Sequence, residues 1–252
     1  KDGAPHLPAF IDLAAQRVRG GGRVDRAILA VLDSGQFILG PQVAELEREL
    51  AAFCGARHVV TCANGTDALQ LVLMAEGVGQ GDAVFVPAFT FLATAEVPVL
   101  MGATPVFIDI DPDTFNIDIA SLEAAIGDAK ARGVTPRCII PVDLYGQPAD
   151  YDAIHAVLDA SDVRAMFVPA TQRQSKLGRI LVVSDAAHSI GSTYHGRENG
   201  LWADATVFSL HSVKNVTTGE GGAICLNLPE PFDNDAEYTF LRAFSLNGQN
   251  KS

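Results

Sequence analysis

Basic residues are scarce in this sequence of 252 residues, and their scarcity limits the partners that the protein can have. Lysine and arginine together number 18 against 30 aspartates and glutamates, so the formal net charge is -12. Nucleic acids and anionic membrane surfaces are bound by basic faces. No stripe of lysine or arginine interleaved with aromatic residues occurs in the sequence. We therefore expect neither a nucleic acid nor a membrane as a partner.

Cysteines and long apolar runs are also few. The four cysteines, Cys54, Cys62, Cys138 and Cys225, are far apart, and no pair has the spacing of a zinc or redox motif. A disulfide framework is unusual in a chain of this size. We expect reduced, mostly buried thiols in a cytoplasmic protein and no metal site. No uninterrupted apolar run is long enough to predict a membrane span.

The sequence does contain a regular alternation of short apolar runs and amphipathic stretches. Hydrophobic residues make up 48% of the chain, enough for a substantial core. Short apolar strands separated by helices imply crossover connections, which predict a three-layer α/β/α fold with a mostly parallel sheet. The predicted strands are 58–62, 83–86, 105–110, 138–144, 180–183, 205–210 and 223–226, and the predicted helices are 11–32, 41–53, 65–76, 91–101, 121–131, 150–158 and 235–244.

The segment 161–178 does not follow this alternation. Its residues are mixed in character, as in Gln172-Arg173-Gln174-Ser175-Lys176, and we expect an excursion on the surface. In the rest of the sequence, the candidate catalytic and ligand-binding residues lie at or after the ends of predicted strands. Ligands of mostly parallel sheets bind beyond the carboxyl ends of the strands.

Lys214 is the most informative residue of the sequence. It lies between an apolar strand and the glycine-rich turn Thr217-Thr218-Gly219-Glu220-Gly221-Gly222. A lysine held there can face a cavity and form a Schiff base with an aldehyde cofactor. Most lysines are solvated surface charges, so Lys214 alone is weak support for a site.

An acid and a histidine follow another apolar strand, in Val182-Val183-Ser184-Asp185-Ala186-Ala187-His188. Asp185 could hold a proton on a pyridine nitrogen, because a paired anion keeps such a ring protonated and electron-withdrawing. His188 could contact the face of the ring or its phenolic oxygen. The alternatives are a helix cap or turn former for Asp185 and a hydrogen-bonded histidine without a role.

Three further segments could complete a site for a flat, phosphorylated cofactor. Gly65 and Thr66 join a strand to a helix, where free N–H groups attract a phosphate. Ser209 could add a hydroxyl to the same phosphate, and an aromatic ring of Pro87-Ala88-Phe89-Thr90-Phe91 could stack on the cofactor. Each feature also has an ordinary interpretation: a capped helix, a strand serine and core aromatics.

Together these motifs resemble the DegT/DnrJ/StrS family of sugar-nucleotide aminotransferases, within the fold-type I enzymes that use pyridoxal 5'-phosphate (PLP). The similarity covers nearly the whole chain. It rests on the segments 11–13, 34–41, 65–69, 87–91, 102–107, 144–148, 185–188 and 209–222.

The resemblance implies a role for each site residue. Lys214 would bind PLP covalently and move the proton, and Asp185 would pair with the pyridine nitrogen. His188 stands where the family more often has glutamine, near the 3-hydroxyl of the ring. The other cofactor-binding residues would be Phe91, stacked on the ring, and Gly65, Thr66 and Ser209 at the phosphate.

The resemblance also implies the reaction: transfer of an amino group, from glutamate, to a keto group of a nucleotide-linked sugar, in polysaccharide biosynthesis by a cytoplasmic homodimer. Family members continue into a smaller C-terminal domain. We expect residues 1–252 to form the PLP-binding large domain with an N-terminal helical segment, without that small domain. Partner subunits of the family often lend groups from the region matching Asn247-Gly248-Gln249, a motif that is imperfect here.

The sequence departs from the family's pattern in two places, and two alternative functions remain. The segment 161–178 is longer than the family's usual connection, and Ser184 replaces the usual acid before Asp185, which we expect to matter little. A PLP-dependent sugar dehydratase on the same scaffold would carry histidine in place of the lysine, so Lys214 argues against it. The chain could also be a truncated, non-catalytic protein for dimerisation or regulation.

Overall fold

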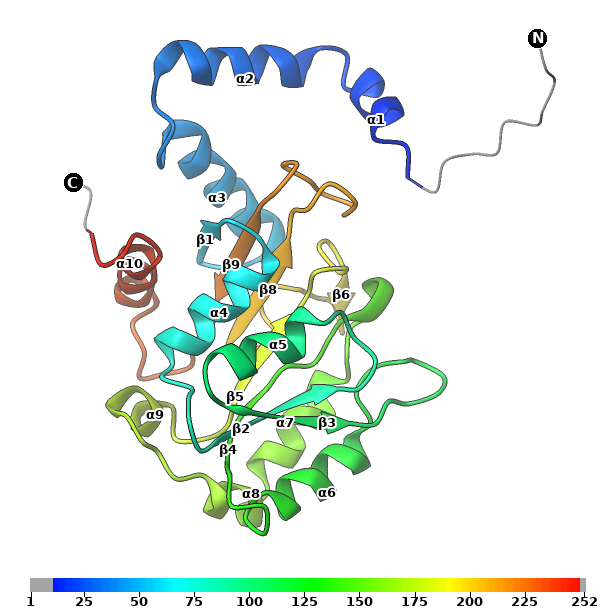
Figure 1. Cartoon of the computed structure of the whole chain (residues 1–252), viewed down its shortest axis with the longest axis vertical. Coiled ribbons are helices and arrows are strands. Elements are labelled where there is room, and N and C mark those ends of the chain that lie inside the picture. The colour runs from blue at the N-terminus through cyan, green and yellow to red at the C-terminus, as the bar shows by residue number, and fades with distance from the viewer. Residues whose placement is uncertain (1–10, 250–252) are drawn as a thin grey trace, which may run out of the picture. The chain divides into compact units, whose positions relative to one another are not determined.

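The computed structural model describes residues 11–249, and the chain divides into two compact units (Figure 1). The first unit ends at Glu45 and the second begins at Leu46. Helix α3 (Pro41–Cys54) runs across this division. Within the described part of the chain, no helix is both long and apolar enough to cross a membrane.

The first unit contains helices α1 (Leu13–Arg19) and α2 (Arg23–Ser34). The single helix predicted over 11–32 is therefore wrong. Gly21 and Gly22 adopt φ values of 59° and 70°, in the left-handed region that ends a right-handed helix. Neither α1 nor α2 contains a buried residue, although α2 carries apolar side chains at helical spacing.

The second unit is built on a seven-stranded sheet in the order β1-β9-β8-β5-β4-β2-β3. Only β9 runs against the others, since it pairs antiparallel with both neighbours while all other pairs are parallel. The prediction of a mostly parallel sheet is confirmed. The strands are β1 (His58–Cys62), β2 (Asp82–Pro87), β3 (Thr104–Ile108), β4 (Thr135–Ile139), β5 (Leu181–Asp185), β8 (Ala205–Ser209) and β9 (Gly222–Leu226).

Helices cover both faces of the sheet, so the predicted three layers are present (Figure 1). Alternate strand residues separate the two cores: Val84 packs in one and Phe85 in the other. Both residues are fully buried, as expected for strands with continuous apolar runs. One face carries α4 (Gly65–Ala75), α5 (Ala93–Leu100) and α10 (Asn234–Ser245), and the other carries α6 (Ile119–Ala129) and α7 (Tyr151–Asp159).

Several predicted boundaries differ from the structure by a few residues, and one hairpin was not predicted. The strand predicted over 138–144 ends at Ile139, and a short 3-10 helix (Leu144–Gly146) follows. Proline cannot donate a backbone hydrogen bond to a sheet, and Pro141 lies in the part of the segment that is not strand. The helix predicted from residue 91 begins at Ala93. The small hairpin of β6 (Thr193–Tyr194) and β7 (Arg197–Glu198) was not predicted.

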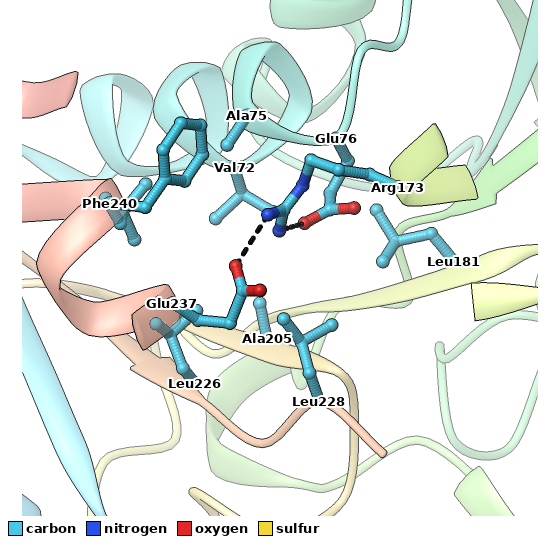
Figure 2. Close-up of a pocket in the computed structure, with 11 residues that line it drawn as sticks. Val72, Ala75, Glu76, Arg173, Leu181, Ala205, Leu226, Leu228, Glu237 and Phe240 are labelled. Atoms are coloured by element: carbon cyan, nitrogen blue, oxygen red, sulfur yellow. Dashed lines mark hydrogen bonds and ion pairs between the residues drawn. The ribbon is translucent and has the colours of Figure 1, made fainter. Parts of the chain in front are cut away.

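The segment 161–178 is more ordered than the predicted excursion on the surface. It forms α8 (Ser161–Met166) and α9 (Gln172–Leu177). The Gln174 side chain is buried, and its amide donates to the carbonyls of Glu76 and Gly77 at 3.0 Å each. Arg173 forms ion pairs with Glu76 and Glu237 (Figure 2). Most residues of the segment are exposed, in agreement with the predicted position on the surface, whereas the two helices and the buried contacts of Gln174 and Arg173 were not predicted.

Candidate cofactor-binding site

The seven predicted site residues line one cavity of about 750 Å³. They come from the segments after β1, β2 and β5 and from the β8–β9 region. Strands β1, β2, β5 and β8 run parallel to one another, so their carboxyl ends meet at the same edge of the sheet. The residues are Gly65, Thr66, Phe91, Asp185, His188, Ser209 and Lys214.

One side of the cavity is formed by the first turn of α4. Asn64 precedes the helix, and its side chain accepts a hydrogen bond from the N–H of Asp67 at 2.8 Å. Helix geometry leaves the N–H groups of Gly65 and Thr66 without intrahelical acceptors, and the positive end of the helix dipole lies here. This turn is therefore suited to binding an anion.

Glycine is required where this turn meets the sheet. A Cβ atom on Gly65 would lie 3.1 Å from Cβ of Ser209. A Cβ atom on Gly222, the first residue of β9, would lie 2.2 Å from the carbonyl oxygen of Asn64. The close contacts of Gly65 with Ser209 and of Gly222 with Asn64 hold the start of α4 near Ser209. The Ser209 hydroxyl and the N–H groups of the first turn of α4 therefore lie on the same side of the cavity.

Asp185 is the last residue of β5 and is 6% exposed. Its Oδ2 accepts from the Thr94 hydroxyl at 2.8 Å, and its Oδ1 accepts from the N–H of Ala187 at 3.3 Å. Burial raises the pKa of Asp185, whereas the hydrogen bond from Thr94 and the charges of His188 and Lys214 oppose the rise. A carboxylate can accept about four hydrogen bonds. Asp185 can therefore take another donor from the cavity.

Lys214 lies in the loop between β8 and β9. Its N–H donates to the carbonyl of His211 at 2.9 Å, and Leu210 N–H donates to the carbonyl of Gly221 at 2.7 Å, which closes the base of the loop. Burial lowers the pKa of Lys214, and the charge of Asp185 opposes this change. A lowered pKa increases the fraction of neutral amine, the nucleophilic form.

His188 is half-buried and is fixed by the segment after β4. The N–H of Tyr145 donates to Nδ1 of His188 at 3.4 Å, and the two rings are parallel with centroids 5.9 Å apart. Tyr145 adopts a φ of 54°, a left-handed conformation that is unusual for a bulky residue. Burial and the charge of Lys214 lower the pKa of His188, and Asp185 opposes them. In neutral His188 with Nδ1 as acceptor, Nε2 carries the proton and can donate.

Phe91 also lines the cavity, and its side chain is 74% exposed. An exposed aromatic face at the mouth of a cavity can stack on a planar ligand. Within the described part of the chain, no group of three or more His, Cys, Asp or Glu residues could hold a metal ion. The first turn of α4 and the exposed ring of Phe91 suit the cavity to an organic anion with a flat ring.

Sequence analysis missed several residues that support the site. Thr94 donates to Asp185, and its hydroxyl lies 2.8 Å from that of Thr90. Thr90 precedes α5, which begins at Ala93, so the four-residue spacing of these threonines is not a helical pair and gave no signal in the sequence. Asp143 and the amide of Tyr145 also gave no signal, since the partners that connect them to the site, Ser184, Ser189 and His188, are more than 40 residues away in the sequence.

Comparison with known proteins identifies the family. Residues 20–251 match the model of the DegT/DnrJ/EryC1/StrS aminotransferase family. The UDP-2-acetamido-2-deoxy-3-oxo-D-glucuronate aminotransferase of Pseudomonas aeruginosa is 45% identical over 96% of this chain and 60% of its own length. The GDP-perosamine synthase of Caulobacter vibrioides is 40% identical over 86% of this chain and 52% of its own length.

The fold agrees with that assignment. A sugar aminotransferase structure from Streptococcus pneumoniae, solved in a PLP-form, superposes with a TM-score of 0.79 at 38% identity and covers 89% of this chain and 56% of its own. The chain thus spans between half and three fifths of the length of these relatives. By its sequence and its fold, the chain belongs to the DegT/DnrJ/EryC1/StrS aminotransferase family.

Proposed function

We propose that this protein transfers an amino group, with glutamate as donor, to a keto group of a nucleotide-linked sugar, using PLP. The observation that carries the proposal is the meeting of Lys214 and Asp185 in one cavity with the anion-binding start of α4. Relatives named for UDP-linked and GDP-linked amino sugars support the substrate class. A relative solved in a PLP-form supports the cofactor.

The residues of the cavity fit PLP chemically. The N–H groups of Gly65 and Thr66, with the Thr66 and Ser209 hydroxyls, would bind the phosphate. Asp185 has two donors and room for a third, which a protonated pyridine nitrogen would supply. The exposed face of Phe91 would stack on the ring.

When bound, PLP supplies an aldehyde and an electron-withdrawing ring that stabilises a carbanion. Lys214, whose pKa is lowered, would attach to the aldehyde and later move the proton between carbon atoms. Asp185 would hold the proton at the ring nitrogen. His188 would donate from Nε2 to the oxygen of the 3-hydroxyl group, because Tyr145 occupies Nδ1.

Assembly as a cytoplasmic homodimer is part of the same proposal. Helix α2 exposes Val24, Ile28, Leu29 and Leu32, each more than half exposed. A row of apolar side chains on one helix is typical of a surface that another polypeptide covers. The four cysteines are free thiols, and a protein without disulfides is compatible with a reducing compartment. Sedimentation analysis of the purified chain tests the assembly.

Covalent trapping tests the cofactor assignment. The chain is incubated with PLP, reduced with borohydride and digested, and the modified peptide is mapped by mass spectrometry. We expect the label on Lys214 and none in Lys214→Ala. Lys176→Ala, which removes a lysine on α9, is the matched control and keeps the label. A label that persists in Lys214→Ala would overturn the assignment of the reactive amine.

An amino-transfer assay tests the reaction itself. Glutamate and the UDP-linked 3-oxo sugar acid named for the Pseudomonas relative are the first substrates to use, with the amino sugar detected by mass. A chain that self-associates and stays folded but binds no PLP would instead support the non-catalytic alternative.

A further inference from the structure

Asp143 is a buried carboxylate that the proposed chemistry does not use. It follows β4 and is 0% exposed. Oδ1 accepts from the Tyr151 hydroxyl at 2.8 Å and from the N–H of Ala149 at 3.1 Å. Oδ2 accepts from the hydroxyls of Ser189 at 2.9 Å and Ser184 at 3.2 Å. These four groups converge on one charge, which is the arrangement that a buried carboxylate needs. The hydroxyls of Tyr151 and Ser184 are also 2.6 Å apart, so one of their two protons can lie between them.

Two of these donors, Ser184 and Ser189, flank the segment that carries Asp185 and His188. Ser184 immediately precedes Asp185, and Ser189 immediately follows His188. The main chain adds a third connection, because the N–H of Asp143 donates to the carbonyl of Asp185 at 3.0 Å. The four residues 185–188 are therefore tied to Asp143 at both ends, beneath the side that faces the cavity.

We propose that Asp143 is a positioning residue: its carboxylate holds the segment 184–189 so that Asp185 and His188 face the cofactor. The inference rests on the proposed function for the identity of the cofactor, while the hydrogen bonds stand without it. It also gives Ser184 a role. The serine that precedes Asp185 was expected to matter little, but a side chain the size of glutamate at this position would compete with Asp143 for the same buried space.

Charge makes this role sensitive to pH. Burial raises the pKa of Asp143 to about 6, against the opposing hydrogen bonds from Tyr151, Ala149, Ser189 and Ser184. Tyr151 stays neutral, because burial raises its pKa well above the usual value. From the side of the site, Asp185, His188 and Lys214 are the other titrating groups. Below pH 6 Asp143 takes up a proton, and at least one of its four donors loses its acceptor.

The test compares Asp143→Asn with Asp204→Asn. Asp204 is an equally suitable buried carboxylate, 2% exposed, that binds Arg179 and the N–H of Val182 at the other end of β5. The first readout is the ¹⁵N NMR signal of the His188 ring in the PLP-free chain, assigned by its loss in His188→Gln. The second is PLP affinity, measured by absorbance titration between pH 5 and 8.

We expect Asp143→Asn to move the His188 signals and to weaken PLP binding by about tenfold at pH 7.5, the lower end of the loss found at metal sites when a partner that orients a ligand-binding side chain is replaced. Its affinity should change less than that of the wild type between pH 7 and 5. Asp204→Asn should lower stability and leave both readouts unchanged. Ser189→Ala, which keeps the carboxylate and removes one donor, should move both readouts in the same direction by a smaller amount.

Equal effects of Asp143→Asn and Asp204→Asn on both readouts would show a purely structural role and end the proposal. If Asp143→Asn does not fold, Ser189→Ala decides by the same comparison. Failure of the proposed function has a different signature, because wild-type Lys214 would then not be trapped with PLP, whereas the His188 signals would still report on Asp143.

Discussion

Two buried polar clusters occupy opposite ends of the same two elements. The carboxyl end of β5 and the start of α4 carry Asp185 and Gly65, which line the large cavity. The other end of β5 and the end of α4 adjoin a cavity of about 10 Å³, where Arg173 lies between Glu76 and Glu237 (Figure 2). Both clusters have charges in an apolar setting, but their charges are balanced in different ways.

The Arg173 cluster closes on itself. Two carboxylates share one guanidinium at 2.5 and 2.6 Å, and the cation lies at the end of α4, where the helix dipole favours positive charge. At the other end, Lys214 and Asp185 face a cavity, and both keep capacity for a further partner. The Arg173 cluster pairs its charges within the protein, although Glu76 Oε2 and Arg173 Nε are buried without a hydrogen-bond partner, whereas the charges of the candidate site face a cavity that can hold a ligand.

Replacing Asp185 by asparagine should have the largest effect on function. Asparagine cannot hold a positive charge on the ring nitrogen, so amino transfer should fall by on the order of 10²-fold or more, the range measured when one group aimed at developing charge is removed. Stability at pH 7 should stay the same or rise, because burial raises the pKa of Asp185 and disfavours its charged form. Steady-state kinetics and thermal unfolding measure the two effects, and unchanged kinetics would refute the pairing.

Replacing Arg173 by methionine should have the opposite profile. It leaves Glu76 and Glu237 buried without their cation, which is expected to lower the free energy of unfolding by about 3 kcal/mol. PLP affinity at a temperature where the variant is folded should be close to that of the wild type. Lys176→Met on the same helix is the control, with a loss of about 1 kcal/mol or less. A large loss of affinity in Arg173→Met alone would show that the two clusters are coupled.

A smaller effect is expected from Gly222, the glycine that packs against the start of α4. Gly222→Ala would push a methyl group into the carbonyl of Asn64, so the start of α4 must move. The free energy of unfolding should fall by about 1–3 kcal/mol. PLP affinity should fall as well, because the start of α4 is the proposed phosphate site. Gly127→Ala in α6 meets nothing within 4 Å and should stabilise the protein by about 0.5–1 kcal/mol without changing affinity. Denaturant unfolding and absorbance titration of both variants check this contrast.

Much of the fold could be predicted from local patterns. The strand predicted over 58–62 matches β1, and the run of four apolar residues at 83–86 lies within β2. Apolar runs reveal that a strand is buried but not its direction, so the reversal of β9 became visible only in the structure. The false single helix over 11–32 had a readable signal in Gly20-Gly21-Gly22, which the apolar periodicity outweighed.

The site was predictable to the extent that its residues follow strands. Gly65, Asp185 and Lys214 stand at strand ends, where the topology of a parallel sheet brings them together. Asp143 follows β4 in the same way, yet its importance depends on hydroxyls from other segments, and hydroxyls are common everywhere in the sequence. Arg173 was misjudged for a similar reason, since its partner Glu237 is 64 residues away.

The reversed strand β9 has a consequence for how the loop that carries Lys214 can change. Because β8 and β9 are antiparallel neighbours, the loop that carries Lys214 leaves the sheet and returns to it at a single edge, from Ser209 to its partner Gly222. A crossover connection between parallel strands would instead have to run from the carboxyl end of one strand back to the amino end of the next. Residues could thus be inserted into or exchanged within this loop with a small entropic penalty, about 0.6 kcal/mol for each doubling of its length. The reach of the amine can therefore be redesigned without rebuilding the scaffold behind it.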